Sequence, residues 1–362
     1  MKIVECIHSM GPGGAERFLT DLCNQLCSDN EIYLISMNCS EEKFRNFYCN
    51  ELLGNIHLID LHYEGKHKVQ YMYKFYKLIK QIRPDIVHIH CILPFLFLAI
   101  LFYRKCVYVQ TLHNKAELGI PKYRKFSKYL FANNIVKLVT ISESNRQSFE
   151  SFFKLNNDTL IYNGRLMPQK TSQFDATKVE IEAYKKYSDD LIFLCVARCN
   201  AQKNIGLLVE SVNALHKSNQ HVQLLIIGDC YDETELGRKW QKMACECIHF
   251  IGTRSNIADY FMLADAFCLS SLYEGMPITL IEAMACKCIP VCTPVSGIVD
   301  IIEDGKTGFV SDDFTFEAYY TALRRFLLER QNINKELLFD KYNQQFSMKV
   351  CAQQYLKLFT SK

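Results

Sequence analysis

The sequence predicts an α/β protein with two open, doubly wound parallel sheets, one in each half of the chain. Short apolar runs rich in β-branched residues alternate with helical patterns, which implies a mostly parallel sheet covered on both faces. The alternation restarts near residue 191, after a polar stretch. A chain of 362 residues is also long for a single hydrophobic core, so two domains are expected.

The first half opens with a strand and a helix. The run Lys2–Ile7 is apolar and β-branched, glycines follow it, and the apolar residues of Ala15–Cys27 then recur at helical spacing. The uncharged stretch Cys91–Tyr103 has 13 residues, whereas a membrane span needs about 20, so a buried helix is expected there. Further strands are expected at Ile32–Met37, Ile56–Leu61, Ile86–His90, Val107–Leu112, Leu138–Ile141 and Thr159–Tyr162.

The second half repeats this pattern. A strand is expected at Leu191–Ala197, with helices at Ile205–Lys217 and Thr234–Cys245. Further strands are expected at Val222–Gly228, Ile248–Ile251, Ala266–Leu269 and Ile289–Cys292, and helical patterns follow Phe314.

The polar stretch Asn163–Asp190 is expected to link the halves, because a glycine and a proline stand near its start. The last helical pattern, Ser347–Phe359, is expected to pack back on the first domain. The expected parts are therefore an N-terminal domain over residues 1–168, a C-terminal domain over 169–345 and a C-terminal helix within 346–362.

Seventeen cysteines are scattered through apolar runs. A secreted disulfide scaffold is not expected, because the chain is long and shows no N-terminal signal sequence. The closest pairs, Cys245/Cys247 and Cys286/Cys288, lack the two-residue gap of a zinc or redox motif. The cysteines are interpreted as small buried hydrophobic residues that stay reduced in a cytoplasmic protein.

Basic residues concentrate in residues 1–168, whose net charge is +6, against −3 for the remainder. Two stretches, Lys66–Arg83 and Pro121–Leu130, interleave lysine and arginine with tyrosine and phenylalanine. This composition suits attachment to an anionic membrane surface, whereas the alternative is a solvated helix whose aromatic side chains face the core. Nucleic-acid binding is not expected, because no recognised module accompanies the charge.

A glycine-rich segment, Gly11-Pro-Gly-Gly-Ala-Glu16, lies where the first strand passes into the first helix. Glycine lets a ligand approach the backbone, and a helix N-terminus offers free N–H groups to an anion. The spacing is that of neither a dinucleotide fingerprint nor a Walker loop. Gly13 and Gly14 are therefore candidates for phosphate binding, with a plain tight turn as the alternative.

Charged residues of the second half follow two of its expected strands. Arg198 and Lys203 follow Leu191–Ala197, at the carboxyl end where open α/β sheets bind ligands. Arginine can hold phosphate oxygens in a bidentate manner, and lysine adds a compact charge. Glu274 and Glu282 are eight positions apart, the first in a loop and the second early in a helix. One carboxylate would then reach a sugar and the other a ribose.

The motifs GGAE, VARCNAQK, EGMPITLIEAMA and TPVSGIVDIIEDGKTGFV together resemble the retaining glycosyltransferases of sequence family 4. The resemblance extends over nearly the whole chain and is most specific between Leu191 and Val310. It implies a GT-B fold, in which two Rossmann-like doubly wound domains face each other across a cleft. It also implies that the N-terminal domain binds an acceptor and the C-terminal domain binds a nucleotide-sugar donor.

The resemblance implies a role for each matching residue. Arg198 and Lys203 match residues that hold the donor diphosphate, and Glu274 matches the one that contacts the transferred sugar. Glu282 matches the residue that contacts the ribose hydroxyls, and His113 matches a histidine near the reacting sugar. A satisfied core histidine is the alternative for His113. The other implied donor-binding positions are Gly13, Gly14, Gly252, Thr253, Ile278, Thr279 and Leu280.

One departure concerns the segment before the expected helix. Many relatives have Phe-Gly where this chain has Met276-Pro277. Proline lacks an N–H, so the expected backbone donors are the amides of Ile278, Thr279 and Leu280. The departure bears on the identity of the donor sugar and not on the reaction.

Retention implies front-face attack by the acceptor hydroxyl, without an enzyme nucleophile. Positioning, and stabilisation of the departing nucleotide diphosphate by Arg198, Lys203 and a helix N-terminus, then supply the catalysis. No Asp-x-Asp is placed to hold a metal, so no metal or other cofactor is expected. His88 and His90 have metal-like spacing, but alternate residues on one strand face are more often structural.

The expected reaction transfers a hexose or N-acetylhexosamine from a UDP-sugar, or with second preference a GDP-sugar, to a saccharide acceptor. A lipid-linked acceptor in surface polysaccharide synthesis (capsule, O-antigen or exopolysaccharide) would place the protein in the cytoplasm, peripherally on the inner face of the membrane. Two other classes stay open: a non-catalytic sugar-nucleotide binding protein, and a phosphorylase- or epimerase-like enzyme of the same architecture.

Overall fold

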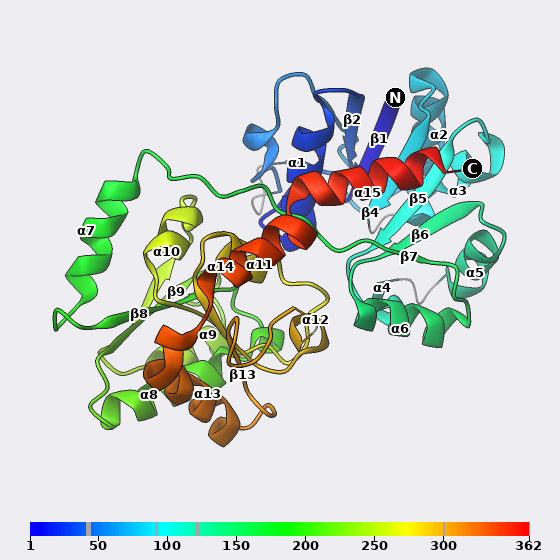
Figure 1. Ribbon diagram of the computed structural model, residues 1–362. Helices are drawn as coiled ribbons and strands as arrows, with labels where there is room; N and C mark the ends of the chain where they lie inside the picture. Colours follow the sequence, from blue (N-terminus) through cyan, green and yellow to red (C-terminus); the bar gives the residue numbers. More distant parts are fainter. Residues whose placement is uncertain (41–44, 91–92, 120–122, 300, 362) are drawn as a thin grey trace. The chain divides into compact units, whose positions relative to one another are not determined.

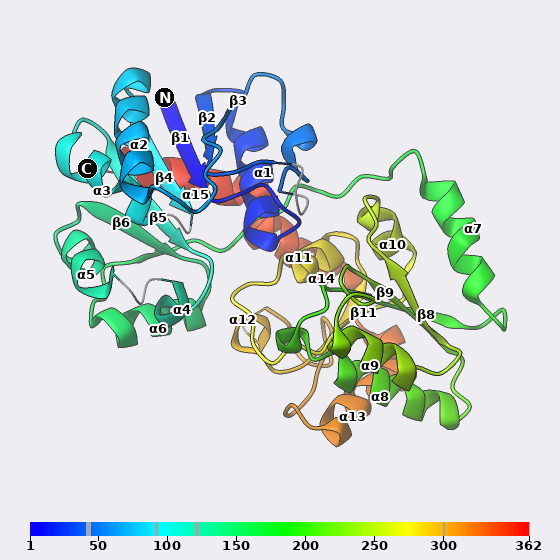
Figure 2. The ribbon, with the colours of Figure 1, turned by 180° about the vertical axis from the view of Figure 1, so that it is seen from behind.

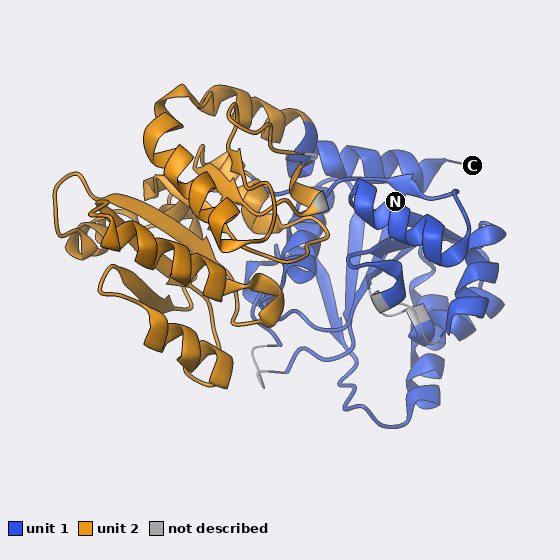
Figure 3. Ribbon diagram, turned by 90° about the horizontal axis from the view of Figure 1, so that it is seen from below, with its two compact units in different colours: residues 1–166, 345–362 blue, residues 167–344 orange. Residues whose placement is uncertain are grey.

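The computed structural model describes residues 1–40, 45–90, 93–119, 123–299 and 301–361. The chain forms two compact units, coloured separately in Figure 3. Unit 1 comprises residues 1–166 and 345–362, and unit 2 comprises residues 167–344. The chain therefore leaves unit 1 after Leu166 and returns after Gln344.

Unit 1 contains a parallel sheet with the strand order β3-β2-β1-β4-β5-β6-β7 (Figure 1). The strands are β1 Lys2–Ile7, β2 Glu31–Ser36, β3 His57–Asp60, β4 Ile86–His90, β5 Val107–Leu112, β6 Val136–Thr140 and β7 Thr159–Leu160. The helices are α1 Gly14–Leu26, α2 Lys68–Ile82, α3 Phe97–Phe102, α4 Ala116–Gly119, α5 Arg124–Ala132, α6 Glu143–Phe153 and α15 Met348–Thr360. Because the strand order reverses between β1 and β4, the carboxyl edge there is a typical ligand-binding position.

The two faces of this sheet differ in polarity. Val4 and Cys6 of β1 belong to a hydrophobic core that includes side chains of α2, α3, α5 and α6. The alternate residue Glu5 lies beside its register partner His88 on the opposite face. Helices α2 and α15 cover opposite faces of the sheet (Figures 1 and 2), and α15 packs against α1. Buried polar side chains therefore lie on the α1 and α15 side.

Unit 2 contains a second parallel sheet with the order β10-β9-β8-β11-β12-β13. The strands are β8 Leu191–Val196, β9 Val222–Ile227, β10 Ile248–Gly252, β11 Ala266–Leu269, β12 Ile289–Cys292 and β13 Phe309–Val310. The helices are α7 Phe174–Tyr184, α8 Ile205–Lys217, α9 Glu235–Met243, α10 Ile257–Leu263, α11 Ile278–Ala285, α12 Ser296–Val299, α13 Phe316–Glu329 and α14 Lys335–Lys341. The order reverses between β8 and β11, so the loops after these strands are neighbours.

The two parallel sheets with their helices confirm the predicted doubly wound α/β class. One local prediction differs, because α7 lies inside the stretch Asn163–Asp190 that the sequence assigned to a linker. Thr177 and Ile181 of this helix are buried in unit 2. With only two buried residues among polar neighbours, the helix has a weak apolar pattern in the sequence.

The expected buried helix over Cys91–Tyr103 is observed only in part, with Ala99 and Ile100 fully buried. Its described part forms a 3-10 turn at Leu93–Leu96 and the short helix α3, and the Phe102 side chain is 70% exposed. The first two residues of the stretch lie outside the described residues. In the part of the chain that the structure describes, no helix combines the length and apolar character needed to cross a membrane.

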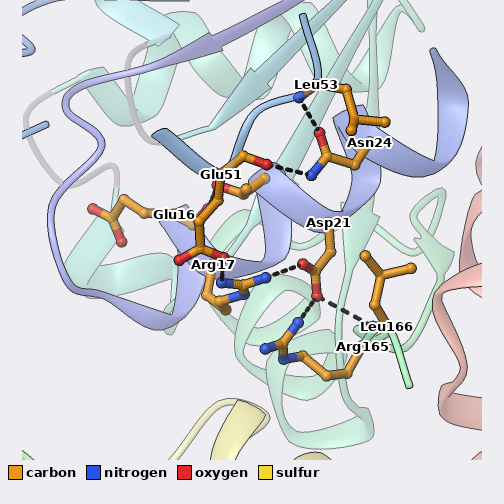
Figure 4. Close-up of polar contacts among 9 residues, drawn as sticks. Glu16, Arg17, Asp21, Asn24, Glu51, Leu53, Arg165 and Leu166 are labelled. Carbon is orange, nitrogen blue, oxygen red and sulfur yellow. Dashed lines mark hydrogen bonds and ion pairs between the residues drawn. The ribbon is translucent and has the colours of Figure 1, made fainter. Parts of the chain in front are cut away.

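The buried carboxylate of Asp21 binds the segment at which the chain leaves unit 1. Asp21 of α1 accepts hydrogen bonds from Arg17 at 2.6 Å, from Arg165, and from the Leu166 amide at 3.2 Å (Figure 4). Arg165 also exchanges two backbone hydrogen bonds of 2.9 Å with residues 346–348 of the returning segment. The departing segment is therefore anchored on α1, and the returning segment is bonded to the departing one within unit 1.

Candidate active site

In unit 2, hydrogen bonds join the loops that follow β8 and β11. The Leu272 N–H donates to the Gln202 carbonyl at 2.8 Å, and the Gln202 side-chain amide donates to the Tyr273 carbonyl at 2.7 Å. Ser270 Oγ donates to the Lys203 carbonyl at 3.0 Å. Because β8 and β11 are adjacent, the two loops form a continuous rim at the carboxyl edge of the sheet.

This rim brings together two of the residues singled out in the sequence. Lys203 Nζ lies 2.7 Å from Glu274 Oε1, and Ser271 Oγ donates to the same oxygen at 2.6 Å. The Glu274 side chain is 9% exposed and that of Lys203 is 23% exposed. The carboxylate is thus partly desolvated and held by two donors, which orients it for contact with a ligand.

Helix α11 begins just after the rim and contains four of the predicted residues. Pro277 is its N-cap, and Ile278 and Thr279 are its first two residues. The structure differs from the expectation that the Leu280 amide is a backbone donor to the ligand. The Leu280 N–H donates to the Pro277 carbonyl at 3.1 Å, and the Leu280 side chain is fully buried. Its amide is therefore already used within the turn. Glu282 lies one turn into the helix and is 9% exposed.

The other predicted residues of unit 2 lie exposed at the same edge of the sheet. Arg198 follows β8, Gly252 ends β10 with a φ of 71°, and Thr253 follows it. Among the residues that the structure describes, no hydrogen bond or ion pair joins these three to the Lys203–Glu274 pair. The three residues therefore lie at the edge where Arg198 is expected from the sequence, but the structure does not bring them into contact with the pair.

In unit 1, helix α1 begins at the glycine-rich segment. Gly13 is the N-cap and Gly14 the first helical residue. The Gly13 N–H donates to the Gly11 carbonyl at 2.8 Å, and the Arg17 N–H donates to the Gly13 carbonyl at 2.9 Å. A Cβ atom on Gly13 would overlap the carboxylate of Glu16, which folds over the turn. The turn is thus tight and leads into a helix long enough to have a substantial dipole.

His113 follows β5 at the carboxyl edge of the same sheet and is partly exposed. Its Nε2 lies 2.7 Å from His90 Nδ1, and the two rings stack with centroids 5.0 Å apart. The Phe18 ring of α1 packs against His113 at a centroid distance of 5.7 Å. His113 therefore lies beside the helix that begins at the glycine-rich segment.

His113 is connected to a network of buried polar side chains. His90 Nε2 and His88 Nδ1 lie 3.1 Å and 2.9 Å from the same atom, Glu5 Oε2. His88 Nε2 lies 2.8 Å from Thr111 Oγ1, which in turn lies 2.8 Å from the Tyr355 hydroxyl of α15. The two strand histidines do lie on one face of β4, as their spacing indicated, but one of them is directly linked to the candidate site.

Sequence reasoning missed three residues. Glu5 is an acid within an apolar strand. Ser271, in the loop after β11, donates a hydrogen bond to Glu274. Asp229 follows β9 at the same edge, and its Oδ1 is buried with no hydrogen-bond partner among the described residues. An acid in an otherwise apolar strand was a signal that the sequence did contain.

Solved structures show the class of fold. A glycosyltransferase from Rickettsia africae ESF-5 superposes with a TM-score of 0.83 at 19% identity, covering 99% of this chain and 97% of that one. Anabaena Alr3699/HepE in complex with UDP and glucose gives a TM-score of 0.81 at 16% identity, with 100% of both chains covered. The two doubly wound units therefore have the GT-B fold.

Two family profiles match successive parts of the chain. The profile described as Glycosyltransferase Family 4 matches residues 12–165, and that of Glycosyl transferases group 1 matches residues 177–346. The chain belongs to the group 1 glycosyltransferases, which confirms the resemblance found in its motifs.

Three named relatives are similar over most of their length. The alpha-monoglucosyldiacylglycerol synthase of Acholeplasma laidlawii is 24% identical, with 91% of this chain and 89% of the relative covered. The capsular polysaccharide biosynthesis glycosyltransferase CapH of Staphylococcus aureus is 23% identical, with 100% and 99% covered. An alpha-1,4-N-acetyl-D-galactosaminyltransferase of Campylobacter jejuni, named for a PP-undecaprenol-linked saccharide, is 23% identical, with 93% and 92% covered.

Proposed function

We propose that this glycosyltransferase moves a hexose or an N-acetylhexosamine, with retention of configuration, from a nucleotide-diphosphate sugar to a saccharide acceptor. The observation that carries the proposal is the Lys203–Glu274 pair on the rim before α11. A UDP-sugar is the favoured donor, supported by the UDP and glucose in the HepE structure, and a GDP-sugar is second. The names of two relatives specify alpha products, which a retaining enzyme makes from an alpha-linked donor.

Each residue has a role in this reaction. The departing nucleotide diphosphate gains negative charge, which Lys203 and Arg198 would balance together with the first amides of α11. Binding of the diphosphate would compete with Glu274 for the lysine, and Ser271 would keep the freed carboxylate oriented toward sugar hydroxyls. Glu282 would hold the ribose. Since the acceptor hydroxyl attacks from the front face, positioning is the main catalytic contribution.

A thermal-shift screen of UDP-, GDP- and ADP-sugars, followed by a transfer assay, tests the proposal. The correct donor should raise the melting temperature, because it binds the folded state, and a UDP-sugar is expected to do so. Product NMR should show the donor's anomeric configuration. Binding without transfer would indicate a binding protein, and cleavage that depends on inorganic phosphate would indicate a phosphorylase. An inverted product would refute retention.

The loop that carries Glu274 rests against Gly297 of α12. A methyl group at Gly297 would overlap the carbonyl oxygen of Gly275, which follows Glu274. We expect Gly297→Ala to displace the loop and to lower kcat by roughly tenfold to a hundredfold, the effect of a small misplacement of a reacting group. Gly54→Ala is the control, because a Cβ there meets nothing within 4 Å. A normal kcat in Gly297→Ala would show that the loop position is unimportant.

No metal is proposed as a cofactor, because Arg198, Lys203 and the N-terminus of α11 supply the positive charge. Transfer should therefore continue at an undiminished initial rate in excess EDTA, with added magnesium causing no increase. Complete loss on chelation, reversed by magnesium or manganese, would contradict this role for the side chains.

We also propose that the acceptor is lipid-linked, as in surface polysaccharide synthesis, and that the enzyme works at the cytoplasmic face of the membrane. The names of three relatives, which specify diacylglycerol, capsular polysaccharide and PP-undecaprenol, support this. The two basic-aromatic stretches, Lys66–Arg83 and Pro121–Leu130, meet within unit 1, where Lys68 Nζ donates to the Tyr123 hydroxyl at 2.6 Å. Residues 121 and 122 of the second stretch lie outside the described residues.

Helix α2 presents both apolar and basic groups to solvent. Phe75 faces the core, but Val69 and Tyr73 are 74% and 50% exposed. Lys77 Nζ lies 4.8 Å from the centre of the Tyr73 ring. Phe102, on the neighbouring helix α3, is 70% exposed. Exposed aromatic groups next to lysines favour a membrane surface over a helix whose aromatic side chains all face the core.

Binding to anionic liposomes tests the membrane proposal. Each basic residue near an anionic surface contributes about 1 kcal/mol, and Lys→Glu reverses a charge instead of only removing it, so Lys74→Glu with Lys77→Glu should weaken binding by at least about 2 kcal/mol, roughly thirtyfold or more, in sedimentation at low salt. Lys239→Glu with Lys242→Glu makes the same charge change at exposed positions of α9 and is the control. If wild-type protein does not sediment with anionic liposomes at low salt, α2 is an ordinary solvated helix.

A further inference from the structure

The network behind His113 contains one anion, and this fixes the direction of its hydrogen bonds. Burial raises the pKa of the Glu5 carboxyl, but His88 and His90 outweigh burial and lower this pKa to about 2. Burial, with His88 beside it, lowers the pKa of His90 to about 4. At neutral pH Glu5 is therefore a carboxylate and His90 a neutral imidazole.

A neutral imidazole has one N–H donor and one acceptor nitrogen. The Glu5 carboxylate can only accept, so His90 Nε2, 3.1 Å away, carries the proton. His90 Nδ1 is then an acceptor, and His113 Nε2, 2.7 Å from it, must donate. Burial, together with His90 and His88, lowers the pKa of His113 well below its usual value, so this ring is neutral as well. Its other nitrogen, Nδ1, is left with a lone pair.

We propose that Glu5 and His90 are positioning residues that hold His113 in the Nε2–H tautomer, so that its Nδ1 accepts a hydrogen bond from a hydroxyl of the sugar substrate. Among the described residues, His113 Nδ1 has no hydrogen-bond partner. His113 is partly exposed, whereas Glu5 and His90 are fully buried. A sugar hydroxyl can donate to this lone pair, but an ionised phosphate oxygen cannot. The inference rests on the proposed glycosyltransferase function and adds the residues that set its geometry.

The other branch of the network supplies a matched control. It runs by hydrogen bonds from the Tyr355 hydroxyl through Thr111 to His88, whose Nδ1 lies 2.9 Å from the same Glu5 oxygen but does not form a hydrogen bond with it. It reaches that carboxylate without passing through the His90–His113 hydrogen bond. Tyr355→Phe therefore removes a buried hydroxyl of the network and leaves the positioning branch intact.

Nitrogen-15 NMR of histidine-labelled protein measures the tautomer directly, with the His113 signals assigned by their loss in His113→Gln. Wild type should show a proton on Nε2 and none on Nδ1. In Glu5→Gln the anion is gone and the amide can accept from His90 or donate to it, so a mixture of His113 tautomers is expected. Tyr355→Phe should match wild type. A proton on Nδ1 in wild type, or an unchanged tautomer in Glu5→Gln, would overturn the proposal.

Kinetics supply a second readout. In Glu5→Gln, kcat should fall about tenfold, as for one lost hydrogen bond, while the KM for the nucleotide-sugar changes little. If Glu5→Gln does not fold, His90→Asn replaces it, because its amide can turn either its oxygen or its nitrogen toward His113. An equal fall of kcat in Tyr355→Phe would indicate a merely structural role and overturn the proposal.

Metal analysis of the purified protein is the third measurement. The ligand atoms of Glu5, His88 and His90 lie within 4.8 Å of one another. A stoichiometric metal ion there would occupy His90 Nε2, move the His90 proton to Nδ1 and reverse the His113 tautomer, which would overturn the proposal. Wild type without any transfer activity would contradict the proposed function, whereas the wrong tautomer in an active enzyme would contradict the positioning role alone.

Discussion

Glu274→Ala and Lys203→Ala should each abolish sugar transfer while leaving unit 2 folded. The two side chains lie 2.7 Å apart, and the proposed mechanism turns the lysine toward the diphosphate and the carboxylate toward the sugar. Loss of one group that stabilises charge in the transition state raises the activation free energy by about 3 kcal/mol or more. This corresponds to a loss of at least about a hundredfold in kcat. Initial rates at saturating donor, with a thermal melt of each variant, measure the effect.

Matched controls come from helix α8 of the same unit. Glu210 and Lys217 are exposed there, so their replacement by alanine should leave both kcat and the melting temperature unchanged. Lys203→Arg keeps the positive charge and should bind the donor better than Lys203→Ala, although the planar guanidinium would contact Glu274 with a different geometry. Near-normal turnover in either alanine variant would mean that the site has been assigned wrongly.

The rim of unit 2 could be predicted because a parallel sheet collects the carboxyl ends of its strands on one edge. Arg198, Lys203 and Glu274 each follow an apolar run that is readable as a strand. The proximity of Lys203 to Glu274 also requires β8 and β11 to be neighbours, although residues 203 and 274 are far apart in the chain. Strand spacing alone does not specify that order, and the family resemblance implied only that both residues contact the donor.

The network of unit 1 could not be predicted, for the same physical reason. Alternation along a strand places His88 and His90 on one face, but only the pairing of β1 with β4 brings Glu5 to them. Two local details could also not be predicted from the sequence. The turn that uses the Leu280 amide depends on the carbonyl direction of Pro277, and the exposure of Phe102 depends on where α3 ends.

Asp21→Ala should lower the free energy of unfolding of unit 1 by about 3–5 kcal/mol, the usual cost of removing one partner from a buried ion pair. The Asp21 side chain is fully buried, and those of Arg17 and Arg165 are only 15% and 12% exposed. Without the carboxylate, the two guanidinium groups lose their shared counter-charge, and the Leu166 N–H loses its acceptor. The chain leaves unit 1 after Leu166, so the attachment of this segment to unit 1 also depends on the Asp21 side chain.

Urea unfolding followed by circular dichroism measures this cost. Asp21→Asn should cost less than the alanine change, since an amide oxygen can still accept from Leu166. Asp29→Ala, an exposed position just beyond α1, is the control and should change stability by less than about 0.5 kcal/mol. In a double-mutant cycle, Asp21→Ala combined with Arg165→Ala should cost less than the sum of the single changes, because both changes remove the same Asp21–Arg165 contact. A cost below about 1 kcal/mol for Asp21→Ala would show that this carboxylate does not anchor the departing segment.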